Sequence, residues 1–276
     1  MGNNSDDWRA TLLDGAIRIP LFSAWKDEDQ MVYASEVDHV DLPLDGILCL
    51  VGCNGSGKTT TIEQVKQALE GAGFRDAKDE KEYNPLHGWR LSLGDKEDKA
   101  TGYLVLFDKD ARYVTKPGAG ESWLTAFDLD EMSGWFCSNG EGVSGRFAGA
   151  AKAMGIFFKK SKKEGVPIVI MVDDADAGTS IDVVSEMRSF LEDVDRKLKE
   201  AGVPHLILVT SNSYELIHDL PCLYVRDMTP RTFTTYEDFR NFTFASRKDK
   251  DARDEKRAKA VKARRKKYAK EGDDDN

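Results

Sequence analysis

The chain has 276 residues, of which 40% are hydrophobic and 32% charged, a balance that is ordinary for a globular protein with a sizeable core. Its longest apolar runs are far too short to cross a bilayer, and residues 1–7 lack a basic-then-apolar leader pattern, so we expect a cytoplasmic protein without membrane insertion. The net charge of −9 is uneven: residues 246–270 hold 13 Lys or Arg against 4 Asp or Glu and residues 271–276 add 4 acids, which leaves −14 for residues 1–245. An acidic body of this kind disfavours broad nonspecific binding to nucleic acid.

The cysteine and histidine residues show neither a disulfide framework nor a metal-binding pattern. The four cysteines contain no CxxC pair, and the four histidines form no spacing cluster with them. We therefore expect reduced thiols, two of which, Cys49 and Cys53, fall in a buried strand and in a glycine-rich loop.

The N-terminal part of the chain mixes short β-like runs with turn signals, which predicts a small antiparallel sheet. The runs are Ala16–Ile19 and Met31–Ala34. Trp25 or Tyr33 can stack on an adenine ring, although an ordinary core or surface aromatic is the preferred interpretation of either residue.

The segment that follows has the order strand, glycine loop and helix. Apolar Gly46–Val51 predicts a buried strand, and the helical spacing of Ile62, Val65 and Leu69 predicts the helix. Between them, residues 52–59 read Gly-Cys-Asn-Gly-Ser-Gly-Lys-Thr, which fits the loop that binds the phosphates of nucleoside triphosphates.

The residue types in this loop match the chemistry of phosphate binding. Glycines let several backbone N–H groups point inward, since no Cβ obstructs the curvature. Lys58 can reach the β- and γ-phosphates, the Thr59 hydroxyl is placed to bind a phosphate-bound Mg²⁺, and Thr60 follows as the next helical residue. The alternative is a glycine-rich turn that matches by chance, and the strand and helix on either side weigh against it.

The middle of the chain is less informative. We expect strands at Trp89–Leu93 and Gly102–Phe107, and a small helical lobe formed by the apolar residues of 119–137. Ser138 and Gly140 then precede a helix-compatible stretch, where free N–H groups and the helix dipole favour an anion. An ordinary helix start with Ser138 as its N-cap fits these residues equally well.

A second polar cluster follows an unbroken apolar run, Ile168–Val172. Such a run is typical of a parallel strand buried on both faces, and it would deliver Asp173 and Asp174 to the C-terminal edge of the sheet. There Asp173 would hold Mg²⁺ and Asp174 would polarise an attacking water. The alternative is two acids that cap a strand-to-helix turn.

The remaining elements continue the alternation of helix and strand. A helix to about Lys199 would bury residues at helical spacing, namely Val183, Met187, Phe190, Leu191, Val194 and Leu198. The strand His205–Thr210 would bring Asn212 to the same sheet edge, and a strand at Cys222–Val225 and a short aromatic helix near Tyr236–Phe244 would complete a domain over residues 1–245.

Residues 246–276 are nearly all charged and cannot bury a core of their own. A solvated helix or a disordered tail is the preferred interpretation. The run Arg253–Lys270 can instead neutralise phosphates of DNA or RNA, which makes nucleic acid a candidate partner.

In this order, the motifs resemble those of the ATP-binding cassette (ABC) ATPases, especially the soluble branch of RecF- and SMC-like heads and small AAA-type ATPases of bacteria and phages. Five segments carry the resemblance: residues 52–59 (Walker A), 168–174 (Walker B and its catalytic acid), 137–141 (signature), 180–182 (D-loop) and 210–213 (switch). The resemblance implies an α/β fold of the P-loop NTPase type, with a mixed sheet flanked by helices, an N-terminal antiparallel β part and a small helical lobe.

The resemblance also implies a mechanism in which ATP, with Mg²⁺, is held between two subunits of a head-to-tail dimer. The Walker loop of one subunit would face Ser138 and Gly140 of the other. The candidate nucleotide-binding residues are then Gly52, Asn54, Gly55, Ser56, Gly57, Lys58, Thr59, Thr60, Ser138 and Gly140. The candidate metal ligands are Thr59 and Asp173, and the candidate catalytic residues are Asp174, Lys58 and Asn212.

Several positions depart from the family pattern. Asp174 stands where Glu is usual, Asn212 stands where His is usual, and no Gln follows Gln67 to form the glutamine loop. These departures indicate slow hydrolysis or an ATP-gated switch.

We therefore expect an ATPase that binds and slowly hydrolyses ATP in a dimer, in DNA maintenance or phage-related defence. The alternatives are the nucleotide-binding subunit of a transporter and a non-hydrolysing ATP-gated interaction switch. A small-molecule kinase is least favoured, because no basic lid is evident between the loop at 52–59 and Asp173.

Overall fold

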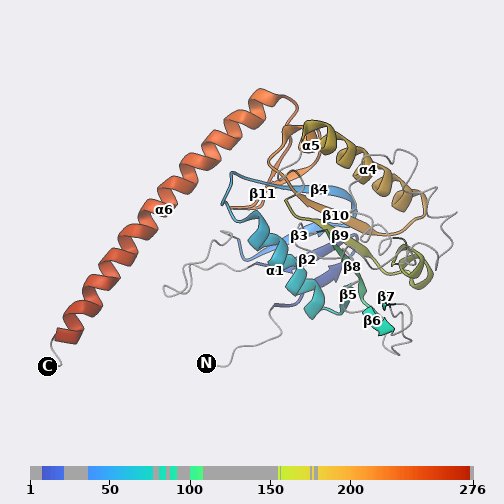
Figure 1. Ribbon diagram of the computed structural model, residues 1–276, viewed down its shortest axis with the longest axis horizontal. Helices are drawn as coiled ribbons and strands as arrows, with labels where there is room; N and C mark the ends of the chain where they lie inside the picture. Colours follow the sequence, from blue (N-terminus) through green and yellow to red (C-terminus); the bar gives the residue numbers. More distant parts are fainter. Residues whose placement is uncertain are drawn as a thin grey trace.

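The computed structural model describes residues 8–21, 37–76, 81–84, 88–91, 100–107, 155, 157–174, 176 and 180–273. Their centre is a seven-stranded sheet with helices on both faces (Figure 1). The strand order is β12 (Thr229–Arg231), β11 (Cys222–Tyr224), β4 (Asp45–Val51), β10 (His205–Thr210), β9 (Ile168–Val172), β8 (Gly102–Phe107) and β5 (Phe74–Asp76). Every neighbouring pair is parallel except β11 and β12, so the expectation of an α/β fold with a mixed sheet is confirmed.

The central strands form because their sequences are apolar on both faces. Every residue of β9 and β10 is buried, as a parallel sheet covered on both sides requires. Alternate residues enter two separate cores: Ile170 and Ile207 face one core, whereas Met171 and Leu208 face the other.

Helices α1 (Lys58–Gly71) and α4 (Ile181–Glu200) cover opposite faces of this sheet (Figure 1). The expected apolar face of α1 is confirmed, since Ile62, Val65 and Leu69 are all buried. Residues 157–164 are also helical and add Phe157 to the core on the α4 side.

The apolar stripe of α4 differs slightly from the prediction. Val184 is buried, whereas Val183 is only half-buried and Phe190 packs partly buried at the edge of the core. The observed stripe has a regular three-and-four spacing from Val184 through Met187 and Leu191, and this rotation leaves Val183 at its margin.

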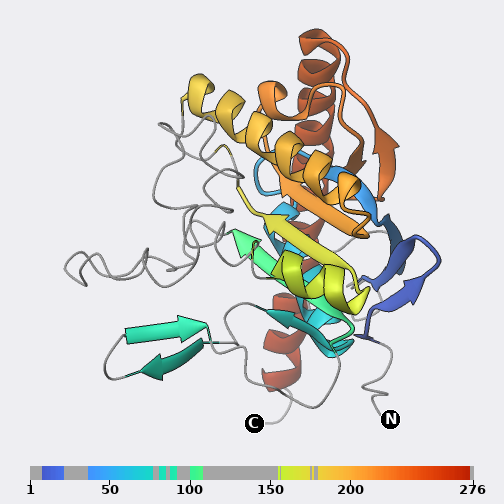
Figure 2. The same cartoon turned by 90° about the vertical axis from the view of Figure 1, so that its right-hand side faces the viewer.

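A three-stranded antiparallel sheet precedes β4, as expected. It consists of β1 (Thr11–Leu13), β2 (Ala16–Pro20) and β3 (His39–Pro43), and Figure 2 shows it in dark blue at the side of the large sheet. Strand β2 confirms the run at Ala16–Ile19, while Met31–Ala34, Trp25 and Tyr33 lie outside the described residues.

Strand β8 confirms the run at Gly102–Phe107, and β7 (Gly88–Leu91) overlaps the expected strand Trp89–Leu93. Strand β7 pairs with β6 (Lys81–Asn84) as an antiparallel hairpin. The lobe predicted within 119–137 lies outside the described residues.

The C-terminal region is one continuous helix. The short helix expected near Tyr236–Phe244 is the start of α6 (Tyr236–Asp273), which follows the four-residue helix α5 (Tyr214–Ile217) and the last two strands. Figure 1 shows the C-terminal half of α6 standing away from the body. Among the described residues, none of the helices carries an apolar stretch long enough to cross a membrane.

Candidate functional site

Three neighbouring strands end at one edge of the sheet, and a polar segment follows each of them. Strand β10 lies between β4 and β9 and is parallel to both. The residues that follow these strands therefore meet at the C-terminal edge of the sheet, which is the usual ligand-binding edge of such folds. They include residues 52–57, which we name the glycine loop, together with Asp173 and Asn212.

The glycine loop needs glycine for two different reasons. A Cβ at Gly52 would lie 2.5 Å from Ser56 Oγ, so the loop closes on itself only without that atom. Gly57 begins α1 with a φ of 105°, a left-handed conformation that other residues rarely adopt. No side chain among the described residues caps α1, so the N–H groups of its first turn remain available for an anion.

Ser56 adds a second observation inside the loop. The residue is 6% exposed, and its Oγ has no hydrogen-bond partner among the described residues. A buried hydroxyl without a partner is costly, and a bound polar ligand would satisfy it.

Lys58 is the centre of the site. Its buried Nζ donates to Asn212 Oδ1 at 2.8 Å and to the Gly52 carbonyl at 3.0 Å, with the Cys53 carbonyl at 3.4 Å. Burial lowers the pKa of Lys58, and the carboxylate of Asp176 opposes that shift most strongly. Two of the candidate catalytic residues, Lys58 and Asn212, are thus in direct contact.

Asp173 lies between two threonine hydroxyls. Thr210 Oγ1 donates to Asp173 Oδ1 at 2.6 Å, and Thr59 Oγ1 lies 3.4 Å from the same oxygen. Two ligands at right angles on one Mg²⁺ would be about 3 Å apart, so the spacing of Thr59 and Asp173 fits that ion. Among the described residues, no group of three or more His, Cys, Asp or Glu could hold a metal.

Asp174 and Asp176 shape the turn after β9. Asp174 has a φ of 55°, and its N–H donates to Thr210 Oγ1 at 2.7 Å. Asp176 Oδ2 accepts the N–H of Asn212 at 2.8 Å. The turn therefore fixes the backbone of Asn212, whose side chain binds Lys58.

The remaining candidates divide into two groups. Asn54 and Thr59 are exposed and Gly55 lies at the surface, whereas Thr60 is half-buried in the first turn of α1. Ser138 and Gly140 lie outside the described residues. The part of the expected dimer site that these two residues would contribute is therefore outside them as well.

The glycine loop is also contacted by α6. The Cys53 N–H donates to the buried Ser246 Oγ at 3.0 Å, and Arg247 Nη1 lies 3.5 Å from the Asn54 carbonyl oxygen. Lys250 packs so closely on the loop that a Cβ at Gly55 would lie 2.9 Å from Lys250 Cε.

A second set of contacts holds α6 beside the loop. Asp249 pairs with Arg226, which follows β11, and with Arg253 on its own helix at 3.3 Å. Tyr224 Oη donates to Asp249 at 3.4 Å, and the Val225 N–H donates to the Val51 carbonyl at 3.1 Å. Through β11, α6 is thus tied to the strand that leads into the loop.

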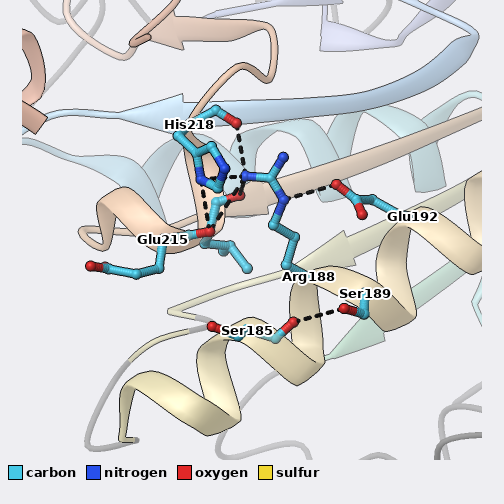
Figure 3. A network of polar contacts seen from close by, with 7 residues as sticks. Ser185, Arg188, Ser189, Glu192, Glu215 and His218 are labelled. Atoms are coloured by element: carbon cyan, nitrogen blue, oxygen red, sulfur yellow. Dashed lines mark hydrogen bonds and ion pairs between the residues drawn. The ribbon is translucent and has the colours of Figure 1, made fainter. Parts of the chain in front are cut away.

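Arg188 fixes the segment that follows Asn212. Figure 3 shows its guanidinium reaching from α4 to the end of α5, where Nη1 donates to the His218 carbonyl at 2.8 Å and contacts His218 Nδ1 at 2.6 Å. The same Nδ1 also lies 3.2 Å from the Glu215 carbonyl oxygen. The Arg188 side chain also binds Glu192 at 2.8 Å, which orients it.

Sequence reasoning missed three residues of this site. Thr210 was placed at the end of a strand and in the switch-like segment 210–213 but was given no role, although a hydroxyl at the end of a buried apolar run is a recognisable signal. Asp176 gave no signal beyond its proximity to Asp173. Ser246 gave none, because it contacts a residue 193 positions away.

Comparisons with known proteins add no assignment to this geometry. No protein-family model matches the chain. No curated protein matches its sequence either.

Proposed function

We propose that this protein binds ATP with Mg²⁺ at the glycine loop and hydrolyses it slowly, as an ABC-class ATPase of the P-loop type. The observation that carries the proposal is the meeting of Lys58, Thr59, Asp173 and Asn212 at one sheet edge, around an uncapped helix start. A triphosphate and its metal need a cation, N–H donors and a carboxylate, and the presence of all three at this sheet edge supports the proposal.

Each residue has a defined part in this reaction. The first-turn N–H groups of α1 and Ser56 Oγ bind phosphate oxygens, and Lys58 exchanges its carbonyl partners for them. Thr59 and Asp173 hold Mg²⁺, which when bound neutralises charge on the phosphates. Asp174 accepts a proton from the attacking water.

The proposal also covers the oligomeric state, the biological process and the cellular location. Two copies would enclose the nucleotide head to tail through Ser138 and Gly140, in DNA maintenance or phage-related defence. A cytoplasmic location is part of it, because Cys49, Cys53 and Cys222 are buried free thiols, which suit a reducing compartment.

A specific contact favours a second candidate, a non-hydrolysing ATP-gated switch. Asn212 Oδ1 accepts from Lys58 Nζ at 2.8 Å, so an uncharged amide stands beside the lysine. Asn212 cannot donate a proton or carry charge as an imidazolium would, and Asp174 is one methylene shorter than glutamate. Both features allow binding without turnover.

The test is to measure ATP binding by calorimetry and phosphate release, with the mass of the complex, for the wild type and three variants. Asp174→Asn should lower turnover by about 100-fold or more while an ATP-bound dimer accumulates. Lys58→Ala should lose ATP affinity, because it removes the buried cation of the loop. Asp193→Asn is the matched control, since this carboxylate lies on the outer face of α4, away from the site, and pairs with Arg196 at 2.9 Å.

Three results separate the candidates. Turnover that survives Asp174→Asn contradicts the role of that carboxylate. ATP binding without turnover in the wild type favours the switch. Absence of ATP binding in the wild type overturns the proposed function.

A further inference from the structure

The N-terminal half of α6 is built onto the glycine loop. Three successive loop residues are contacted from one face of the helix: Cys53 by Ser246, Asn54 by Arg247 and Gly55 by Lys250. Ser246 is 2% exposed, and its oxygen satisfies the Cys53 N–H away from water. A change in the loop backbone therefore has to move α6 or break this contact.

The C-terminal half of α6 has a different composition. Residues 256–270 hold nine Lys or Arg and no Asp or Glu, whereas residues 236–255 hold five basic and six acidic residues. The helix is continuous through both halves, so the residues that contact the glycine loop and the basic segment belong to one uninterrupted helix.

The charge density of the basic half suits a nucleic-acid backbone. At 1.5 Å per residue, 15 helical residues span about 22 Å, which gives one positive charge per about 2.5 Å. Duplex DNA carries one negative charge per about 1.7 Å of its axis. The segment stands away from the acidic body in Figure 1, so a duplex can approach it.

We propose that residues 256–270 of α6 bind the phosphodiester backbone of a nucleic acid, and that α6 couples this binding to occupancy of the glycine loop through its contact at Ser246. The coupling rests on the proposed function, whereas binding by the basic half does not. Because linkage is reciprocal, ATP should shift nucleic-acid affinity by the same factor by which nucleic acid shifts ATP affinity.

Composition argues against an anionic membrane as the partner. Helices that lie on membranes carry a face of large apolar residues beside their basic face. Residues 256–273 contain only Val261, Tyr268 and alanines as apolar residues. Binding to a phosphate backbone needs no such face.

The experiment measures the affinity of a fluorescent 20-base-pair duplex by anisotropy, with no nucleotide, ADP or ATP and Mg²⁺. A single strand of equal length and phosphatidylserine vesicles are the other probes. ATP binding is measured separately by calorimetry on the same preparation. The key variant replaces Arg264, Arg265, Lys266 and Lys267 by Gln, which favours helix, so that circular dichroism can verify folding.

The matched control removes the same charge elsewhere. It replaces Lys159, Lys160, Lys162 and Lys163 on the helix at 157–164 by Gln. We expect duplex affinity to fall at least about tenfold in the α6 variant and to stay unchanged in the control. In the wild type, the logarithm of affinity should fall with the logarithm of salt with a slope of about −4 or steeper.

The coupling has its own readout. ATP should change duplex affinity between about 5- and 150-fold, and Ser246→Ala should reduce that change while retaining nucleotide-free binding. Equal duplex affinity with and without bound ATP overturns the coupling. Equal losses in the two Gln variants, or vesicle binding without binding of either nucleic acid, overturns the nucleic-acid assignment.

The two proposals fail in different ways. If calorimetry detects no ATP binding, the proposed function and the coupling both fall, whatever the duplex does. If ATP binds and neither the duplex nor the single strand binds, only the inference about α6 falls.

Discussion

Helices α4 and α6 are both long and rich in charge, yet different forces hold them. The stripe that α4 buries consists of Val184, Met187, Leu191, Val194 and Leu198. Among the residues of α6 whose side chains the structure describes, Phe239 and Phe242, near its start, pack against the core. Beyond these, α6 has ion pairs four residues apart, such as Lys250 with Asp254 at 2.6 Å and Lys259 with Glu255 at 2.7 Å.

The difference teaches which part of each helix is fixed by the body. A buried stripe fixes a helix along its whole length, since every turn loses apolar surface to the core. Ion pairs between side chains four residues apart on a helix contribute only about 0.3–0.5 kcal/mol each. The position of α6 therefore depends on its first turns and on the polar contacts at Ser246 and Asp249.

The largest effect should come from breaking the stripe of α4. Leu191→Ala removes a side chain that is 4% exposed, and we expect the free energy of unfolding in urea to fall by about 2–5 kcal/mol. The matched change in α6, Val261→Ala, should alter it by less than about 0.5 kcal/mol. Similar losses in the two variants would contradict the comparison.

A smaller loss should follow from detaching the start of α6. Ser246→Ala leaves the buried Cys53 N–H without its acceptor, so we expect a loss of about 1–3 kcal/mol in urea unfolding. Ser189→Ala is the control on α4, because its hydroxyl donates to the Ser185 carbonyl at 3.1 Å on an exposed face (Figure 3). If the two serine variants are equally stable, α6 does not depend on the loop contact.

The start of α4 should also respond to acid. Hydrogen bonds from Ser180 and from backbone N–H groups lower the pKa of Asp182 below its ordinary value of 3.8. Its stabilising contribution is therefore present above that value and is lost as pH falls through the lower, folded-state pKa. Between pH 5 and 2, the free energy of unfolding in urea should fall less steeply with decreasing pH for Asp182→Asn than for the wild type. Parallel curves would refute this role of Asp182.

The smallest effect should come from removing the basic half of α6. A chain that stops at Glu255 should have a free energy of unfolding within about 0.5 kcal/mol of that of the full chain. The full chain should show more helical ellipticity at 222 nm than the truncated chain, because it retains residues 256–273. This difference should grow as salt is added, because salt screens repulsion among like charges on adjacent turns. An apolar contact of this half with the body would instead show as a clear loss of stability on truncation.

The elements that sequence predicted are those with strong local patterns. Strands β4, β9 and β10 are continuous apolar runs, and α1 and α4 have clear helical spacing. Short strands such as β5 and β12 were not predicted, because three residues carry no period and their pairing partners come from elsewhere in the chain. The choice of Val184 over Val183 depended on the rotation of α4 against the sheet.

The candidate site divides in the same way. The glycine loop and its neighbours Lys58 and Thr59 follow from a contiguous motif, and the placement of Asp173 and Asn212 follows from the rule that parallel strands end at one edge. The assignment of nucleotide and metal to them stays a prediction. The contact between Asn212 and Lys58 needed the structure, since the motif gives no side-chain direction.

The sequence by itself determined the α/β class, the order of the central elements and the position of the glycine loop, because each is encoded by neighbouring residues. Only the tertiary structure decided that Asp176 fixes Asn212 and that Ser246 meets Cys53. These contacts join residues that lie 36 and 193 positions apart, and no local periodicity or propensity records such a pairing. The packed sheet and the entry point of α6 set them, and both arise only when the whole chain has folded.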